Sequence, residues 1–357
     1  MRSHTGNLWD MKGTWIAMTT TLVTAMSLAG SAGAQERIAP ARRIPIPTDV
    51  SPQLQAMAAN PPPADFNTWP TTVEGWVARQ RASEASGART AAEMAGRLNV
   101  AISSRVLGGV TVFDVVPQTV APENRNRLLL HLHPGCYVVG GGSAATVEAV
   151  LMAGLGHFRV VSIDYRMPPT AYFPAALDDA VTVWKEALKS HDASQMAVFG
   201  SSAGGALTLA MVLRAKQLGL PLPAAIAPGT PMADLTGVGD SLATNALIDN
   251  VLVSREGFCE PAARFYANGH DLSDPLLSPV YGDFSGFPPA ILTTGTRDLL
   301  LSGTARVHRR LRAAGVEAQL QVFEAMSHAQ YLRDDQVPET REAFREISAF
   351  FDRHLAR

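Results

Sequence analysis

The segment VFGSSAGGA, residues 198–206, decides how the rest of the chain is interpreted. An apolar strand end runs into a glycine-rich turn, and an alanine-rich, helix-forming stretch follows. In the pattern Gly-x-Ser-x-Gly the middle serine, here Ser202, lies on a sharp strand-to-helix turn, and the two glycines allow tight packing. We therefore predict that Ser202 is a nucleophile and that the Ala203 backbone N–H, at the helix start, faces developing negative charge.

A Gly-Ser turn before an ordinary helix would look much the same, so the surrounding sequence has to support this interpretation. Residues 128–137, LLLHLHPGCY, read as a buried strand that opens into a loop. Residues 291–298, ILTTGTRD, and 322–328, VFEAMSH, each run from an apolar strand to a polar residue just past its end, Asp298 and His328. The chain order Ser, Asp, His after such a loop is typical of the α/β-hydrolase fold.

From about Val106 to the C-terminus the sequence resembles the hormone-sensitive-lipase-like branch of that fold, the bacterial family IV esterases. Its His-Gly-Gly-Gly loop corresponds to HPGC at 133–136, and its Asp-Tyr-Arg-Leu-x-Pro segment to DYRMPP at 164–169. Its Gly-Asp-Ser-Ala-Gly-Gly turn corresponds to GSSAGG at 200–205. The resemblance implies a serine hydrolase acting on carboxylic esters.

The chemistry of ester cleavage assigns roles to three side chains. A serine hydroxyl needs a base within hydrogen-bond distance to take its proton, and among the histidines only His328 follows a late strand after an acid. Asp298 then orients the imidazole and stabilises its charged form. A loop aspartate that caps the following helix would give the same local sequence as Asp298.

The resemblance also implies an oxyanion hole formed by the backbone N–H groups of Gly135, Cys136 and Ala203. Pro134 replaces the first glycine of the family loop and has no N–H to donate. Cys136 replaces a glycine, and two further departures are Ser201 in place of Asp and Thr170 in place of Glu. These departures leave open how the turn around the nucleophile is supported by hydrogen bonds.

Strand-like and helix-like segments alternate through the catalytic region. This alternation predicts an α/β fold with a mostly parallel eight-stranded sheet and helices on both faces. The expected strands lie near 100–106, 110–116, 127–133, 158–164, 195–200, 223–228, 288–294 and 317–323. The expected helices lie near 143–155, 175–190, 203–218, 254–268, 302–314 and 338–354.

The remaining segments predict the domain organisation. Residues 1–34 combine an apolar stretch with a small-residue cleavage pattern, which indicates a signal peptide that is cut after Ala34. The mature enzyme is therefore expected to be periplasmic or secreted. Translation from Met11 is an alternative start. Residues 35–98 form an N-terminal arm, proline-rich and extended or irregular to about residue 70, then a helix. Residues 99–357 form the catalytic domain, and by resemblance an insertion near 235–275 completes a cap with the arm.

The amino-acid composition argues against nucleic acid as a partner. The chain has 30 basic and 32 acidic side chains and is 46% hydrophobic, which is ordinary globular composition without the basic blocks that nucleic acid requires. Its two cysteines, Cys136 and Cys259, could form one bridge in principle. We expect instead two small buried hydrophobic residues, because a bridge would tie the oxyanion loop to a mobile insertion.

Two functional classes remain open at this point. One is a carboxylesterase for small to medium soluble esters, including xenobiotic or herbicide esters, and the same triad would also suit a lactone, amide or carbonate. The other is a non-catalytic small-molecule-binding protein on the same fold, although such relatives lack the histidine. We expect no metal, no organic cofactor and no stable membrane insertion, and a homodimer is compatible with the sequence.

Overall fold

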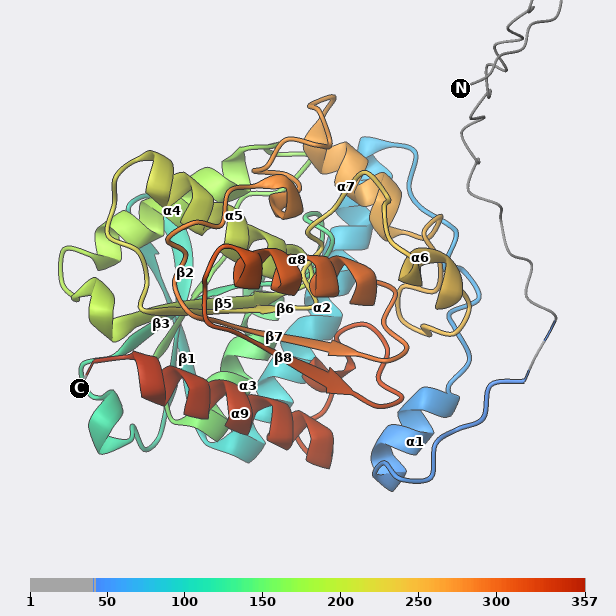
Figure 1. Cartoon of the computed structure of the whole chain (residues 1–357), viewed down its shortest axis with the longest axis horizontal. Coiled ribbons are helices and arrows are strands. Elements are labelled where there is room, and N and C mark those ends of the chain that lie inside the picture. Colours follow the sequence, from blue (N-terminus) through green and yellow to red (C-terminus); the bar gives the residue numbers. More distant parts are fainter. Residues whose placement is uncertain (1–40, 42, 357) are drawn as a thin grey trace, which may run out of the picture. The chain divides into compact units, whose positions relative to one another are not determined.

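A single eight-stranded sheet forms the centre of the protein in the computed structural model, which describes residues 41 and 43–356 (Figure 1). The expected signal peptide lies outside the described residues. The strands are β1 (Val100–Leu107), β2 (Val110–Pro117), β3 (Leu128–Leu132), β4 (Val160–Ile163), β5 (Met196–Ser201), β6 (Ala225–Gly229), β7 (Ala290–Gly295) and β8 (Ala318–Phe323). Their order is β1-β2-β4-β3-β5-β6-β7-β8.

The pairing of these strands is mostly parallel, as the sequence predicts. β2 pairs antiparallel with both β1 and β4, and every other neighbouring pair is parallel. Parallel pairing brings the carboxyl ends of β5, β6, β7 and β8 to one edge of the sheet. Ser202, Asp298 and His328 all follow strands at this edge, which is where ligands bind in sheets of this kind.

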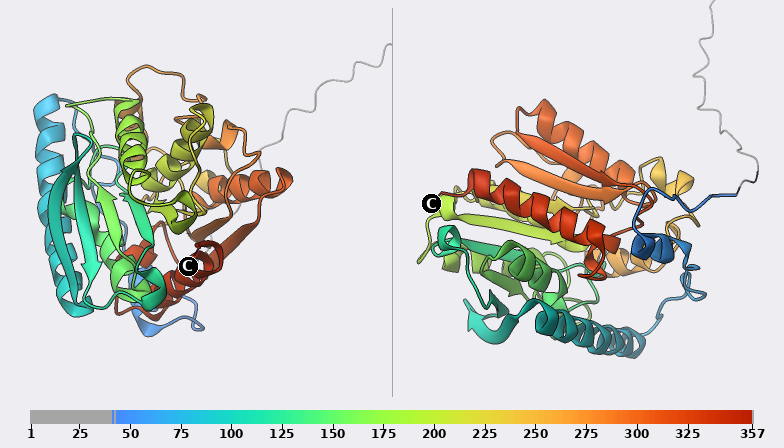
Figure 2. Two further views of the ribbon diagram at one scale, coloured as in Figure 1. Left: turned by 90° about the vertical axis from the view of Figure 1, so that its left-hand side faces the viewer. Right: turned by 90° about the horizontal axis from the view of Figure 1, so that it is seen from below.

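Helices cover both faces of the sheet (Figure 2). They are α1 (Pro52–Ala59), α2 (Val73–Leu98), α3 (Val147–Gly156), α4 (Ala175–Ala187), α5 (Ala203–Gln217), α6 (Ser241–Thr244), α7 (Cys259–Ala267), α8 (Leu301–Ala313) and α9 (Pro338–His354). Apolar residues of α4, α5 and α8 share one core cluster, and those of α3 and α9 share a second. Alternating residues of the central strands supply both clusters, for example Val198 to the first and Phe199 to the second.

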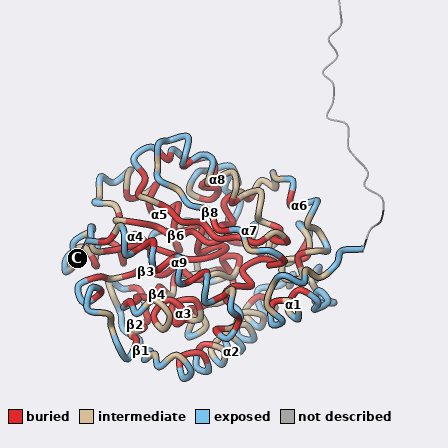
Figure 3. Tube along the Cα trace, turned by 60° about the horizontal axis from the view of Figure 1, so that its bottom comes forward, coloured by how far each residue is buried: buried red, intermediate tan, exposed pale blue. Residues whose placement is uncertain are grey.

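Burial follows this layering (Figure 3). All six residues of β5 are buried, as are all six of β7, because helices lie over both of their faces. The edge strand β1 is mostly exposed. Ser202 therefore follows one of the most deeply buried strands, so the turn that holds it is supported from both faces of the sheet.

The expectation of extended or irregular chain up to residue 70 is wrong at α1. Pro52 occupies the first turn of this helix, where its missing N–H costs nothing, and the Ser51 hydroxyl accepts a hydrogen bond from the Leu54 N–H at 3.1 Å. A serine cap followed by proline is a helix start, and the high proline content of the segment hid it. Leu54 is fully buried in the second core cluster, so the helix is held against the body.

The long connection between β6 and β7 carries α6 and α7, and α7 contacts the N-terminal helix α2. Trp76 of α2 stacks on Phe265 with ring centroids 5.1 Å apart, and its ring lies 5.7 Å from that of Phe258. Two segments far apart in the sequence are therefore packed together. Among the helices of the described residues, none is long and apolar enough to cross a bilayer.

Candidate active site

The turn after β5 holds Ser202 in a backbone conformation that L-residues rarely adopt. Its φ is 58° and its ψ is −120°, while its N–H donates to the Gly229 carbonyl oxygen at 2.9 Å. A Cβ on either Gly200 or Gly204 would collide with the carbonyl oxygen of Leu132, so β3 approaches the turn as closely as glycine permits. A strained serine between two such glycines is the geometry of a nucleophile elbow.

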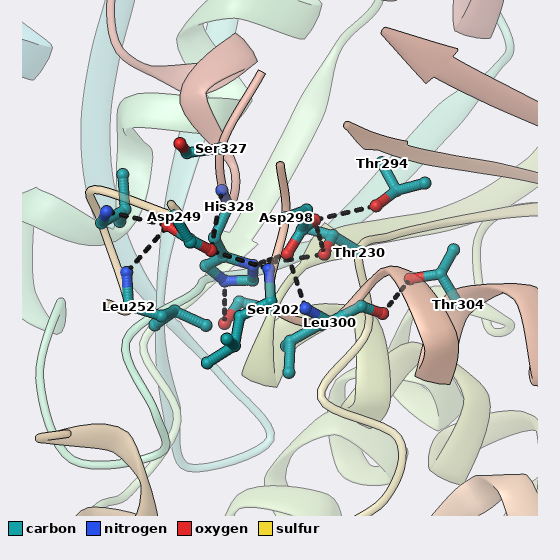
Figure 4. A network of polar contacts seen from close by, with 12 residues as sticks. Ser202, Thr230, Asp249, Leu252, Thr294, Asp298, Leu300, Thr304, Ser327 and His328 are labelled. Carbon is teal, nitrogen blue, oxygen red and sulfur yellow. Dashed lines mark hydrogen bonds and ion pairs between the residues drawn. The ribbon is translucent and has the colours of Figure 1, made fainter. Parts of the chain in front are cut away.

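The structure brings Ser202, His328 and Asp298 together in one chain of hydrogen bonds (Figure 4). The Nε2 atom of His328 lies 2.9 Å from the Ser202 Oγ, and its Nδ1 lies 3.0 Å from the Asp298 Oδ1. All three side chains are buried. The imidazole is thus placed to take a proton from the serine while the carboxylate fixes its orientation.

Asp298 is supported by partners that the sequence analysis missed. Thr294 donates to its Oδ2 at 2.9 Å, the Thr230 hydroxyl also donates to Oδ2, and the Leu300 N–H donates to Oδ1 at 2.8 Å. Burial opposes ionisation of Asp298, but the charge of His328 and these hydrogen bonds outweigh it and hold the pKa of the Asp298 carboxyl below its usual value. The carboxylate is therefore charged when the imidazole accepts a proton.

Thr230 and Thr294 could have been found from the strand pattern. Thr230 follows the last residue of β6, and Thr294 is next to the last residue of β7. Polar residues at the carboxyl ends of β6 and β7, the next two strands after β5 in the sheet, lie at the same edge as Ser202. Threonine is common in strands, however, so its presence alone did not distinguish a site residue from an ordinary strand residue.

The backbone N–H groups of the three expected oxyanion donors have no hydrogen-bond acceptor among the described residues. Within residues 43–356, none of the N–H groups of Gly135, Cys136 and Ala203 donates a hydrogen bond to another residue. Gly135 has a φ of 126°, and a Cβ there would collide with the Val139 carbonyl oxygen. Buried backbone N–H groups are seldom left unpaired, so the arrangement suits an external acceptor such as an oxyanion.

His133 supports the loop rather than the reacting atoms. Its ring stacks on Tyr165 with centroids 3.9 Å apart, its Nδ1 lies 2.8 Å from the Pro134 carbonyl oxygen, and the Tyr165 hydroxyl donates to the His133 carbonyl oxygen at 2.8 Å. Burial lowers the pKa of His133 to about 3. The imidazole is therefore neutral at physiological pH, and its Nδ1–H donates to the Pro134 carbonyl.

The expectation of two unpaired cysteines is wrong. Cys136 and Cys259 form a disulfide, with their Cα atoms 5.3 Å apart. The expectation failed because it took the insertion to be mobile, whereas α7 packs directly on the oxyanion loop: Tyr266 of α7 stacks on Tyr137 with centroids 4.5 Å apart. The bond therefore joins two surfaces that are already in contact.

Ser201, which replaces the family's aspartate, is still paired with a carboxylate. Its hydroxyl donates to the Glu148 Oε1 at 2.7 Å and lies 2.6 Å from the Tyr331 hydroxyl. The other oxygen of Glu148, Oε2, lies 3.1 Å from the His131 Nε2. All four residues are buried, so a carboxylate from α3 stands behind the nucleophile turn where the family pattern has one on the turn itself.

Asp249, in the connection between α6 and α7, is a second buried carboxylate beside the triad (Figure 4). Its burial and the nearby Asp298 carboxylate raise the pKa of Asp249, and the charge of His328 opposes this increase. The sequence offered no signal for it, because it belongs to the insertion, where no strand end marks a position. It accepts hydrogen bonds from four backbone N–H groups, two of which belong to the loops that carry the triad.

A cavity lies beside the triad. Its wall includes Leu299 and Leu300, which follow Asp298, and Met232, whose N–H donates to the Ser202 carbonyl oxygen at 2.9 Å. The insertion contributes Leu252 and Cys259 to the same wall. Most of the wall is apolar, but Asp234, Arg255, Glu260 and Arg264 also contribute to it, and none of the three triad side chains lines it. Among the described residues, no group of three His, Cys, Asp or Glu side chains is placed to bind a metal.

Comparisons with known proteins agree with this geometry. The family model for the α/β-hydrolase fold matches residues 129–332. An acetyl-hydrolase of Streptomyces hygroscopicus is 30% identical over 243 residues, which are 68% of this chain and 81% of that protein. An esterase of Acinetobacter venetianus is 25% identical over 231 residues, or 64% of this chain and 76% of that protein.

Solved structures are similar over most of the chain. The crystal structure of esterase E25 has a TM-score of 0.87 at 43% identity and covers 90% of this chain and 99% of its own. An esterase from the bacterial hormone-sensitive lipase family has a TM-score of 0.74 at 28% identity, with 86% of this chain and 99% of its own covered.

Proposed function

Since the chain belongs to the α/β-hydrolase fold family and is an esterase of its hormone-sensitive-lipase-like branch, we propose that it cleaves small to medium soluble carboxylic esters through Ser202, His328 and Asp298. The predictions of fold, family and enzyme class are confirmed, which sets aside a non-catalytic binding protein. The observation that carries the proposed mechanism is the pair of distances from the His328 ring, 2.9 Å to Ser202 and 3.0 Å to Asp298.

Acylation starts at Ser202. As its Oγ attacks the carbonyl carbon of the ester, its proton moves to the Nε2 atom of His328, and Asp298 stabilises the imidazolium that results. The carbonyl oxygen becomes an oxyanion, which accepts hydrogen bonds from the N–H groups of Gly135, Cys136 and Ala203. Collapse of this intermediate breaks the bond to the alcohol oxygen, and that oxygen leaves with the proton from His328.

Deacylation repeats these steps with water as the nucleophile. His328 takes a proton from the water, the hydroxide oxygen attacks the acyl carbon, and Ser202 leaves with the proton returned by the imidazole. The products are the carboxylic acid and the free enzyme. A lactone, carbonate or amide would pass through the same intermediates.

The size of the substrate is proposed from the surroundings of the triad. Ser202 is almost fully buried, and residues of the insertion form much of the wall of the nearby cavity. A buried nucleophile beneath an insertion fits an ester of modest size better than an emulsified lipid. The acetyl-hydrolase named above supports a short acyl group. Xenobiotic and herbicide esters of this size are included in the proposed substrate class.

We further propose that the enzyme acts in the periplasm or outside the cell after removal of residues 1–34. The proposal rests on the apolar stretch and the small-residue pattern that ends at Ala34. A disulfide in the folded body is consistent with an oxidising compartment. Expression of the full chain followed by N-terminal sequencing of the exported protein tests it: a mature chain that begins at Gln35 supports export, and retention of residues 1–34 contradicts it.

The test of substrate class is a series of p-nitrophenyl esters from acetate to palmitate. We expect kcat/KM to be highest for short or medium acyl chains and to fall steeply beyond them. Rapid hydrolysis of emulsified long-chain triglyceride would contradict the proposed substrate size while leaving the esterase mechanism intact.

A further inference from the structure

We propose that Asp249 is a positioning residue that holds the two catalytic loops in register from the insertion between β6 and β7. It touches neither the nucleophile nor the place of the reacting carbonyl, so it acts through His328 and Asp298. This role rests on the proposed use of these two residues in catalysis, and the experiments below separate the two proposals.

The hydrogen bonds of Asp249 form a bridge between three chain segments. Its Oδ1 accepts from the N–H groups of Val251 and Leu252, at 2.8 and 3.1 Å, within its own loop. Its Oδ2 accepts from the Leu299 N–H at 2.8 Å and from the His328 N–H at 3.3 Å. The first of these donors is adjacent to Asp298 in the chain, and the second belongs to the catalytic histidine itself.

One carboxylate oxygen thus contacts the backbone of both loops whose side chains have to meet. The His328 ring bonds Asp298 at 3.0 Å, so an error in the relative position of the two loops changes this contact directly. Displacements of about 1 Å in a catalytic group can lower the rate about 100-fold. Asp249 is fully buried, and water therefore has little access to replace its carboxylate as the acceptor.

The neighbouring residue Asn250 anchors the same loop from its other side. Its N–H donates to the Ser327 Oγ at 3.2 Å, and its Oδ1 accepts from the Gln330 Nε2 at 2.9 Å. Its Nδ2 donates to the carbonyl oxygens of Met57 and Asn60, at the end of α1. The loop that carries Asp249 is therefore held by hydrogen bonds to the histidine loop and to the N-terminal arm.

The negative charge of Asp249 also acts on the imidazole. During acylation His328 becomes positively charged. A buried carboxylate that accepts the His328 backbone N–H stabilises this charge more strongly than a solvated carboxylate would. Asp298 makes the direct bond to the ring, and Asp249 adds a second negative charge at longer range. Removal of the charge is therefore expected to lower kcat rather than substrate binding.

The variant Asp249→Asn has almost the same shape and tests the carboxylate. An amide offers one acceptor oxygen, and its NH2 group would face the N–H donors of either its own loop or the catalytic loops. We expect kcat for p-nitrophenyl acetate to fall about 10- to 100-fold while KM changes less than about threefold. A kcat within twofold of wild type in the folded variant would overturn the proposal.

The matched control is Asp274→Asn, which changes an aspartate of the same insertion. The Asp274 Oδ1 accepts the Leu276 N–H at 2.8 Å within its own turn and bonds no loop of the triad. We expect its kcat to stay within about twofold of wild type. An equal loss of kcat in both variants would mean that the effect of an Asp-to-Asn substitution in the insertion does not depend on its position. That result would overturn a specific role for Asp249.

Combination with His328→Ala separates positioning from general damage. If Asp249 acts through the histidine, Asp249→Asn should cost little further activity once the imidazole is gone, because residues that act as a unit are not additive. A full additional 10- to 100-fold loss in the double variant would contradict the proposal. Normal activity of His328→Ala alone would instead contradict the proposed triad, so the two failures are distinguishable.

Hydrogen exchange on the wild-type enzyme tests the same bonds without any substitution. The amide protons of Leu299 and His328 lie in loops, where amides without an acceptor exchange rapidly. We expect both to be protected to a degree similar to the amides of β7. Rapid exchange at both positions in the folded enzyme would show that the Asp249 bonds do not persist, and would overturn the proposal even if Asp249→Asn does not fold.

Discussion

Cys136, which offers one of the free N–H groups beside Ser202, is bonded through its side chain to Cys259 at the first residue of α7. The bond spans a sequence separation of 123 residues and joins the oxyanion loop to the insertion. A cross-link that closes a loop of this length restricts the unfolded chain strongly. The same bond links the loop of the expected oxyanion donors to Cys259, which lines the cavity near the triad.

The variant Cys259→Ser removes this bond and leaves the Cys136 N–H in place. We expect a loss of about 2–4 kcal/mol of stability, since native disulfides that close long loops contribute in this range. Thermal unfolding should show a decrease in Tm of roughly 3–6 °C. A reductant should lower the Tm of the wild type by a similar amount and leave that of Cys259→Ser unchanged. Two thiols that react with Ellman's reagent in the native, unreduced protein would contradict the bond.

The buried pair Ser201 and Glu148 predicts how the family's aspartate would behave here. The variant Ser201→Asp would place a second carboxylate within hydrogen-bond distance of Glu148, in a buried cluster where neither residue has an Arg or Lys among its hydrogen-bond partners. An uncompensated buried charge costs about 3–5 kcal/mol. We expect a large decrease in Tm and a lower yield of folded protein.

The double variant Ser201→Asp/Glu148→Gln removes the repulsion and serves as the control. Its Tm should return a large part of the way to that of the wild type, because the single remaining carboxylate would face an amide and the Tyr331 hydroxyl. The single variant Glu148→Gln should cost less than Ser201→Asp. Equal stability of Ser201→Asp and the wild type would show that Glu148 does not carry a charge against this turn.

The oxyanion loop predicts different results for two neighbouring positions. Pro134→Gly removes no donor, so kcat should stay within about tenfold of wild type. Gly135→Ala keeps the N–H, but its Cβ would meet the Val139 carbonyl oxygen and its φ of 126° disfavours alanine, so the loop has to move. We expect kcat to fall about 100-fold or more. A larger loss in Pro134→Gly than in Gly135→Ala would contradict the assignment of the donors.

The parts of the site that the sequence predicts are those attached to strand ends. Ser202 follows a glycine-marked turn, and Asp298 and His328 follow apolar strands, so chain order and strand pattern suffice to bring them to one edge of the sheet. The strand pattern located all eight strands of the described residues, and the central ones were recognisable because buried parallel strands read as short apolar runs between polar segments.

The parts that the sequence did not predict depend on how irregular segments pack. Asp249 lies in the insertion and Glu148 lies on α3, and neither has a local pattern that distinguishes it from a surface acid. Cys259 could be paired with Cys136 only once α7 was placed over the oxyanion loop. These contacts are long-range, and periodicity carries no information about them.

The most direct test of the central claim is covalent labelling of the active serine. The wild-type enzyme, treated with a fluorophosphonate, should gain one adduct by mass spectrometry, and peptide mapping should place it on Ser202. Ser202→Ala should stay folded, take no adduct and lose at least about 10⁴-fold in kcat, and the double variant with His328→Ala should lose no more than either single variant. An adduct on another residue, or esterase activity retained in folded Ser202→Ala, would contradict the assignment of Ser202 as the nucleophile.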